Sequence, residues 1–584
     1  MSVIFERCFP PILDGLIERF ARPAYRHHRI EAWLFVDEPT RREGERKFAD
    51  YGIAARLRSA YKPLLHAVLE DISPTDIARL DIAYPRHEIG HENRFRLETY
   101  PLAGLCGPAQ ISFSPGRTDS LVYDVSITRT DGACLRHEIF APNREHRAID
   151  GTALLSPTGW LKVSDADGGV IEDRRLETEY EALFQATVAA IADHDWGDGE
   201  PWFEELNIRV SLPVHDRELP VGDEFVSLRE ALHEEFYFTL LKMFHKKSGR
   251  PASDRTVRPG QIAPEILYGG PVAKVTVETR CFAAHNGATV APHQPLDRAE
   301  RAIGIEQVDS ELAKIGGQVF SARSYAGRKI DGRYHEGHEK PVMISAGQHA
   351  NETSGVVGAL RAAHALIRRP GAHFAISPLE NPDGYALHQR LILDNPRYMH
   401  HSARYTALGD DLEYRRPPAL WEKAIRIEAQ RLTGAKLHIN LHGYPAHEWT
   451  QPLSGYIPHG FALWMLPKGF FPILRHHEGW RDHAERLIDV VTARLAGVPG
   501  LKAFNDRQIA LYDAHAGGHE FRIVNGFACL VSQNNDCAVP LTLITEYPDE
   551  TVYGDAFVAA HTAQMATVIA AYEAWQALSI AANR

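Results

Sequence analysis

Residues 340–355, KPVMISAGQHANETSG, begin with a short apolar run and continue into a polar segment that contains His349 and Glu352. The run is typical of a buried strand, and the sequence from residue 354, SGVVGALRAAHALIRR, is typical of a helix. The two polar residues therefore lie at a strand-to-helix junction. In a chain with 31 histidines, a single His-x-x-Glu pair is more often a helix cap or a surface pair than part of a metal site. A third ligand and a general base in matching positions would favour the metal site over a helix cap or a surface pair.

Three further apolar runs follow the same style and are separated by long helical stretches. They are HFAISPL (373–379), KLHINLHG (436–443) and LTLITE (541–546). Apolar strands that alternate with helices predict an α/β fold, with a mixed, mainly parallel sheet flanked by helices. Ligands of such sheets bind beyond the carboxyl ends of the strands. His442 and Glu546 stand at two of these ends, so we expect them to meet His349 and Glu352 in one crevice.

This set of residues has the parts of a hydrolytic metal site. Two histidines and one carboxylate with an open fourth position are the usual ligands of a catalytic zinc ion. A further carboxylate can take a proton from water that the metal acidifies. The set therefore has the parts needed to split an amide bond, and the surrounding segments decide between this interpretation and a structural role for the same residues.

The sequence segments around these residues resemble those of the zinc carboxypeptidases of the carboxypeptidase A type. The resemblance covers residues 340 to 554, the second half of the chain only, and rests on six segments in the family's order. They are GQHANETSG (347–355), ENPDGY (380–385), ARYTALGDDLEYR (403–415), NLHGY (440–444), LYDAHAGGHEF (511–521) and TEYPDETVYG (545–554).

The resemblance implies roles for the residues at the strand ends. His349, Glu352 and His442 would hold one zinc ion per chain. Glu546 would be the general base that activates water and later protonates the leaving amine. Asp411 would hold the imidazole of His349 in its ligating tautomer.

It also implies the residues that bind substrate. Arg404 occupies the place of the arginine that steadies the oxyanion, and Arg390 and Arg397 are rivals for that role. Tyr512 corresponds to the tyrosine of a mobile loop that caps the substrate, although a surface loop aromatic is an almost equal interpretation. Tyr444, two positions after His442, is a further candidate.

One departure affects the expected specificity. Where the family usually has an Asn-Arg pair that grips a C-terminal carboxylate, this chain has Glu413 and Tyr414. An acidic side chain there would repel a free carboxylate. Arg415 could substitute after a shift of one position, so we expect recognition of the C-terminus to be atypical.

Three functions fit these observations. The first is hydrolysis of a peptide or peptide-like amide bond by a carboxypeptidase-type enzyme. The second is hydrolysis of N-acyl amino acids by an amidohydrolase of the desuccinylase and aspartoacylase kind, which the short gap of 90 residues between Glu352 and His442 resembles. The third is a non-catalytic binding protein, against which the complete ligand set argues.

Length and composition limit the remaining possibilities. At 584 residues the chain predicts more than one domain. We expect an α+β N-terminal region of unknown role over 1–284, with room for two subdomains, and the catalytic domain over 301–584. The segment 283–300, AAHNGATVAPHQPLDRAE, would connect them.

Charge and cysteine usage indicate the partners and the compartment. A net charge of −12 argues against nucleic acid as a partner. No run of about 18 apolar residues is present, which argues against a membrane span. The N-terminus lacks the apolar core of a signal peptide, and the six cysteines are scattered, so we expect a cytoplasmic protein with buried free thiols. The sequence leaves the oligomeric state open.

A competing zinc motif lies in the first half. His87-Glu88-Ile89-Gly90-His91 matches HExxH, which places two ligands on one face of a helix. Gly90 disfavours a helix, the next stretch, RFRLETYP (94–101), alternates like a strand, and no convincing third ligand follows. We therefore predict that this motif holds no metal.

Overall fold

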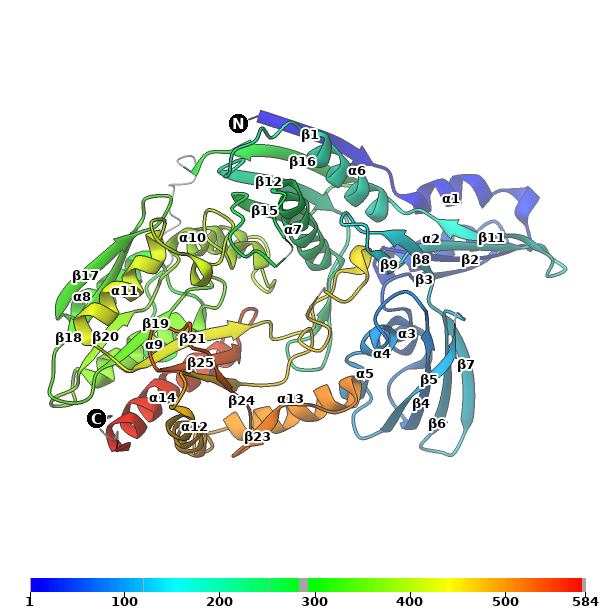
Figure 1. The fold of residues 1–584 in the computed structure, drawn as a ribbon. Coiled ribbons are helices and arrows are strands. Elements are labelled where there is room, and N and C mark those ends of the chain that lie inside the picture. Colours follow the sequence, from blue (N-terminus) through cyan, green and yellow to red (C-terminus); the bar gives the residue numbers. More distant parts are fainter. Residues whose placement is uncertain (1, 119, 252, 283–291, 459, 580–584) are drawn as a thin grey trace.

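The C-terminal half is built on one nine-stranded mixed sheet (Figure 1). The computed structural model describes residues 2–118, 120–251, 253–282, 292–458 and 460–579. In spatial order the strands are β17 (Gln318–Arg323), β18 (Lys329–His335), β20 (Phe374–Ser377), β19 (Val342–Ala346), β21 (Leu437–Tyr444), β25 (Leu541–Pro548), β22 (Phe471–His476), β24 (Phe527–Gln533) and β23 (Arg522–Val524).

The four strands expected from the sequence are present and form the centre of this sheet. β20, β19, β21 and β25 are parallel neighbours in that order. The strands on either side are added mostly antiparallel, as β18 is to β20 and β22 is to β25. The prediction of a mixed α/β sheet is thus confirmed, but the parallel part is mainly its centre.

Helices cover both faces of the sheet. α8 (Ile305–Ile315), α9 (Ser354–Leu366), α12 (Arg481–Leu495) and α14 (Asp555–Ala577) pack on one face, and α11 (Ala424–Thr433) packs on the other. The alternation along β21 follows from this. Leu437, Ile439 and Leu441 are buried in the core under α9 and α14, so His442 points to the opposite face.

The N-terminal half contains three four-stranded sheets and the hairpin β8 (Asn143–Arg147)–β9 (Ala153–Pro157). The first sheet is β1 (Ser2–Phe9), β16 (Ala273–Arg280), β12 (Glu205–Leu212) and β15 (Gln261–Tyr268), with α6 (Glu179–Asp193) and α7 (Leu228–Lys247) packed on it. The second is β11 (Val170–Leu176), β10 (Gly159–Ser164), β2 (Arg29–Leu34) and β3 (Ala54–Ser59), beside α1 (Ile12–Phe20) and α2 (Glu38–Ala49). The third is β5 (Gln110–Thr118), β4 (Ile77–Arg86), β6 (Val122–Arg129) and β7 (Cys134–Phe140).

The sheets of the two halves share no strand. Those of the first half use residues 2 to 280, and the nine-stranded sheet uses 318 to 548. The connection predicted at 283–300 falls between them, and its residues 283–291 lie outside the described ranges. The bounds 1–284 and 301–584 remain our proposal for the domains.

Two expectations about the chain's chemistry have different outcomes. In the described ranges, no helix combines the length and apolar character needed to cross a bilayer. All six cysteines are free thiols, but the expectation that they are buried is wrong for Cys8, Cys134 and Cys281, which are exposed.

Candidate metal centre

The turn after β19 places His349 and Glu352. Gly347 has a φ of +60°, and a Cβ there would lie 2.9 Å from a side-chain carbon of Leu379, so glycine is required at this position. The next residues turn back over the end of the sheet, and α9 begins at Ser354. The sequence GQHANETSG therefore brings both polar side chains to the carboxyl end of β19.

The neighbouring strands supply the other two residues. His442 on β21 is paired in register with Glu546 on β25, and residues directly opposite each other project from the same face of a sheet. The hydroxyl of Thr545 accepts a hydrogen bond from the backbone N–H of His442 at 3.1 Å. The register thus fixes the general-base candidate beside the third ligand candidate.

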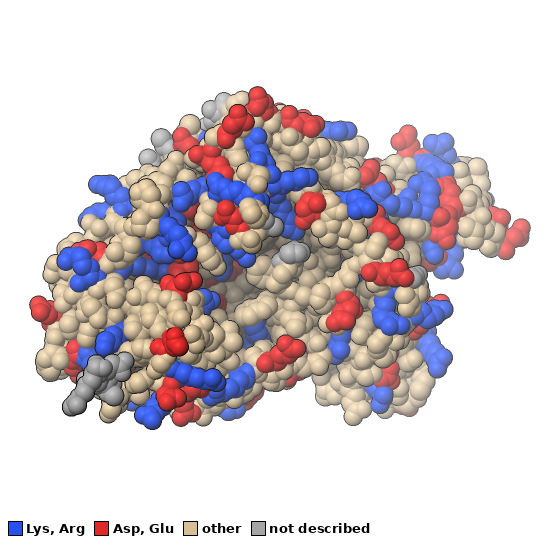
Figure 2. All heavy atoms as spheres, in the orientation of Figure 1, with Lys and Arg blue, Asp and Glu red and all other residues tan. Residues whose placement is uncertain are grey.

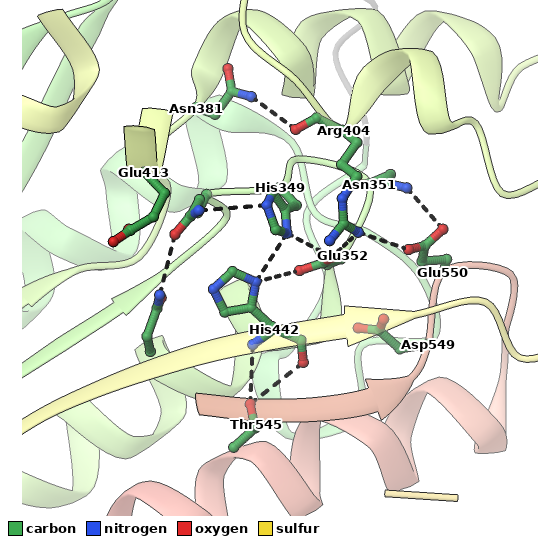
Figure 3. Close-up of polar contacts among 12 residues, drawn as sticks. His349, Asn351, Glu352, Asn381, Arg404, Glu413, His442, Thr545, Asp549 and Glu550 are labelled. Atoms are coloured by element: carbon green, nitrogen blue, oxygen red, sulfur yellow. Dashed lines mark hydrogen bonds and ion pairs between the residues drawn. The ribbon is translucent and has the colours of Figure 1, made fainter. Parts of the chain in front are cut away.

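Three side chains converge as a ligand set (Figure 3). His349 Nδ1 and His442 Nδ1 lie 3.0 Å apart, and each lies 2.9 Å from a different carboxylate oxygen of Glu352. All three residues are buried. Among the described residues, they alone form a group of three or more His, Cys, Asp or Glu side chains that could hold a metal ion. Two imidazole nitrogens and a carboxylate at such distances are the donor set that zinc prefers.

The other ring nitrogen of His349 faces an acceptor. His349 Nε2 lies 3.4 Å from Asp411 Oδ2, and Asp411 Oδ1 accepts hydrogen bonds from Gln348 Nε2 and from the backbone of Glu413. A proton held on Nε2 leaves the lone pair on Nδ1, directed at Glu352 and His442. This is the contact expected of Asp411.

Glu546 is half-buried, and no hydrogen bond or ion pair joins its carboxylate to the described residues. Burial raises the pKa of Glu546 to about 8, and the carboxylate of Glu352 adds to the shift. A carboxylate that faces the site without a partner is available to exchange protons with a bound water or substrate.

Of the three candidate arginines, the structure brings Arg404 to the ligand set. Its Nη1 pairs with Glu352 and lies 3.6 Å from Glu550 Oε1. Asn381, from the ENPDGY segment, donates a hydrogen bond to the backbone carbonyl of Arg404 at 3.4 Å, and Asn351 donates to Glu550 (Figure 3). Glu550 and Asn351 are neighbours that the sequence did not indicate.

The rival arginines are engaged elsewhere. Arg390 pairs with Glu205 and Glu265 of the N-terminal half, at 2.8 and 3.2 Å. Arg397 pairs with Glu218 at 2.7 Å. Neither contacts the ligand set.

Arg415 is not placed to bind substrate as expected. Its side chain is buried, where it donates to both carboxylate oxygens of Asp410, to Thr406 and to Glu422. The expectation for Arg415 therefore needs correction, because its donors are engaged inside the fold. Glu413 is exposed, and its carboxylate accepts a hydrogen bond from Arg426 at 2.6 Å.

The two tyrosines also differ from their expected settings. Tyr512 lies inside α13 (Leu501–Ala516) and is 3% exposed, so it does not stand on a loop. Gly517 ends this helix with a φ of +89°. Tyr444 is buried, its hydroxyl donates to the carbonyl of Gly469 at 2.6 Å, and its ring packs against that of Phe471.

The competing motif at 87–91 does not form a helix. Residues 87–93 are an irregular segment after β4, and Gly90 has a φ of +104°. The Nδ1 atoms of His87 and His91 each accept a backbone N–H, from Ile89 and Asn93. The stretch RFRLETYP, which the sequence suggested as a strand, instead contains the helix α4 (Arg94–Leu97).

The N-terminal half braces the loops that follow the site residues. From α7, Glu234 accepts from His401 at 2.6 Å and Glu230 from the backbone of Met399 at 2.9 Å. The segment after β21 is held in the same way, because Glu230 also contacts His447 at 2.9 Å. Figure 2 shows that this face of the molecule is hollowed at its centre, between the two halves. Sequence patterns alone did not indicate these long-range contacts.

Comparisons with known proteins give neighbours in structure only. No model of a known protein family matches the sequence, and no curated protein matches it. Solved structures that match include a metallo-carboxypeptidase from Burkholderia cenocepacia (16% identity, 52% of this chain and 76% of that one, TM-score 0.29) and carboxypeptidase A from Helicoverpa armigera (13%, 55% and 91%, TM-score 0.30). A metallo-carboxypeptidase from Pseudomonas aeruginosa, in complex with (2-guanidinoethylmercapto)succinic acid, matches at 15% (52% and 71%, TM-score 0.28). At these TM-scores the likeness carries no argument, so the functional inference rests on the site itself.

Proposed function

We propose that the chain is a zinc-dependent hydrolase of peptide or peptide-like amide bonds, of the carboxypeptidase type with atypical recognition of the C-terminus. The observation that carries the proposal is the convergence of His349, Glu352 and His442 within 4.8 Å, beside a carboxylate, Glu546, that has no partner among the described residues. The donor set fits one zinc ion per chain.

The chemistry follows from the side chains around this set. A zinc ion bound there would supply a Lewis acid that polarises a carbonyl and acidifies water. Glu546 would take the proton of the attacking water and deliver it to the leaving nitrogen. Arg404 would stabilise the negative charge that develops on the carbonyl oxygen, and Asp411 would keep His349 in the tautomer that ligates through Nδ1.

The test combines metal content with substrate preference. Purified protein is expected to hold about one zinc per chain and to hydrolyse N-acylated dipeptides with a free C-terminus. N-acyl amino acids form the second arm of the assay, and faster turnover of these would favour the desuccinylase-like alternative. Zinc at one per chain without hydrolysis in either arm would contradict the proposal and favour a binding protein.

A further inference from the structure

Lys468 is a buried lysine that forms no ion pair with the described residues. Along the chain it lies between β21 and β22, just before β22 begins. It is 4% exposed, and its Nζ has no hydrogen-bond partner among the described residues. The ammonium instead faces aromatic rings, with centroids at 4.1 Å for Trp464, 5.0 Å for Tyr444 and 5.1 Å for Phe471. Burial lowers the pKa of Lys468 to about 7, against the attraction of Glu546. We call Lys468 and these three rings the lysine cage.

Other buried cations near the ligand set have carboxylate partners. Arg404 pairs with Glu352, Arg415 with Asp410 and Arg426 with Glu380. An unpaired buried charge is destabilising, and such a cost is usually retained where the group has a ligand to bind. The lack of a hydrogen-bonded partner for Lys468 among the described residues therefore needs a functional explanation. The three arginines need none, because each is paired.

The lysine cage lies in line with the metal site. In the sheet order, β21, β25 and β22 are adjacent, and both His442 and Phe471 are paired with Glu546. The three side chains therefore project from the same face. Since neighbouring strands are about 4.8 Å apart, β22 lies about 10 Å from β21. One end of a substrate whose scissile bond lies over His442 and Glu546 would therefore lie toward the cage.

The backbone around Lys468 is held in place from within. Its N–H donates to the hydroxyl of Tyr444 at 3.0 Å. Gly469 has a φ of +82°, and a Cβ there would lie 2.6 Å from Asn505 Oδ1, which accepts the N–H of Phe470 at 2.8 Å. Fixed surroundings of this kind are typical of a preorganised binding group.

We propose that Lys468 anchors a carboxylate on the leaving part of the substrate. A carboxylate would provide the missing counter-ion, and the apolar rings would strengthen the pair by excluding water. Lys468 would then supply the positive charge that binds the substrate's carboxylate, where this chain lacks the usual Asn-Arg pair. This inference rests on the proposed function. The carboxylate has two chemical sources, the C-terminus or an acidic side chain of the leaving residue.

The test compares three substrates in wild type, Lys468→Met and the control Lys502→Met. Lys502 is exposed on α13 and paired with Asp506 at 2.7 Å. The substrates are benzoyl-glycyl-phenylalanine, its C-terminal amide and benzoyl-glycyl-glutamic acid α-amide. Wild type and Lys502→Met are expected to prefer a carboxylate substrate, and Lys468→Met to lose about 10- to 100-fold of that preference, mainly through KM. The favoured substrate identifies the source.

An unchanged preference in Lys468→Met, or an equal loss for all three substrates, would overturn the inference. Equal loss would indicate instead that Lys468 acts through the charge of Glu546. The melting temperature is a second readout, because removal of a bare buried charge is expected to raise it. A lower melting temperature together with an unchanged preference would indicate a purely structural cation.

Binding separates this inference from the proposed function. Calorimetry measures N-acetyl-phenylalanine and its amide on the zinc-loaded protein. If wild type hydrolyses none of the substrates, and Lys468→Met loses carboxylate binding, the proposed function is wrong and the carboxylate anchor is supported. If wild type hydrolyses the substrates and Lys468→Met binds the acid as tightly as wild type does, the anchor falls alone.

Discussion

Two histidine segments of this molecule match zinc motifs, and only one forms a cluster of ligands. His87 and His91 follow an outer sheet of the N-terminal half, where their Nδ1 atoms accept backbone N–H groups. His349 follows a central strand, where its Nδ1 faces His442 and Glu352 at about 3 Å. The two segments differ in which strand ends lie beside them. A histidine lone pair can bind a metal only where other ligands, from elsewhere in the chain, lie next to it.

Metal content gives the largest contrast between the two segments. His442→Ala is expected to lose the zinc, because two ligands remain where three are needed. His87→Ala should retain about one zinc per chain. Elemental analysis of the two variants and wild type, purified side by side, measures this. Retention of metal in His442→Ala with loss in His87→Ala would reverse the comparison.

The general-base candidate Glu546 and the glutamate of the HExxH motif, Glu88, give the second contrast. Glu546→Gln is expected to keep the zinc and reduce kcat for amide hydrolysis by about 10²–10⁴-fold, because the amide cannot accept a proton. Glu88→Gln, an exposed position in the HExxH motif, should keep the wild-type rate. The measurement is steady-state kinetics at matched zinc content. Wild-type turnover by Glu546→Gln would remove Glu546 from the mechanism.

Carboxylates near the histidines provide a third pair. Asp411→Asn keeps an acceptor for the backbone of Glu413 but weakens the hold on His349 Nε2, so zinc affinity is expected to fall about 10- to 100-fold. The control is Glu145→Gln, whose carboxylate lies 3.6 Å from His87 Nε2. Competition with a chelator measures both, and equal affinities in the two variants would show that Asp411 does not orient the ligand.

A histidine satisfied without metal gives a prediction that depends on neither zinc nor substrate. Buried His515 accepts the N–H of Ala103 at Nε2, and its Nδ1 lies 3.0 Å from the hydroxyl of Thr99. Burial lowers the pKa of His515 to about 3, with a further contribution from Lys62. Between about pH 6.5 and 3 the unfolded chain therefore binds the extra proton, so the free energy of unfolding falls as pH falls, by about 1.4 kcal/mol per pH unit.

Chemical denaturation at pH 7, 5 and 4 tests this. His515→Gln is expected to be less stable at pH 7 and to have a shallower dependence on pH than wild type. Parallel pH profiles for the two proteins would show that His515 does not set the acid sensitivity.

The centre of the fold and the convergence of His349, Glu352 and His442 were predictable because they follow from local patterns. Largely apolar runs mark β19, β21 and β25, and a His or Glu stands at or just after the end of each. Side chains at the carboxyl ends of parallel strands meet at one edge of the sheet. The positions of His349 and Glu352, shortly after the turn at Gly347, follow from an equally local pattern.

The partners of long polar side chains could not be predicted in the same way. Arg390, Arg404 and Arg415 are alike in sequence, but Glu205, Glu352 and Asp410 bind them in three different places. Each outcome depends on which carboxylate the tertiary fold brings near, and Glu205 comes from the other half. Tyr512 was misplaced for a different reason, since α13 continues to Ala516 and includes the first six residues of the expected loop segment, 511–516.

The pairing of β1 with β16 has a consequence for the order in which the chain folds during synthesis. Ser2 is paired with Thr279, and Phe9 with Ala273, so β1 is made about 270 residues before the strand with which it pairs. At about 5–20 residues per second, a ribosome takes roughly 14 to 55 s to make them. During that interval β1 lacks the adjacent strand of its own sheet, so its backbone hydrogen bonds form only after β16 has been made.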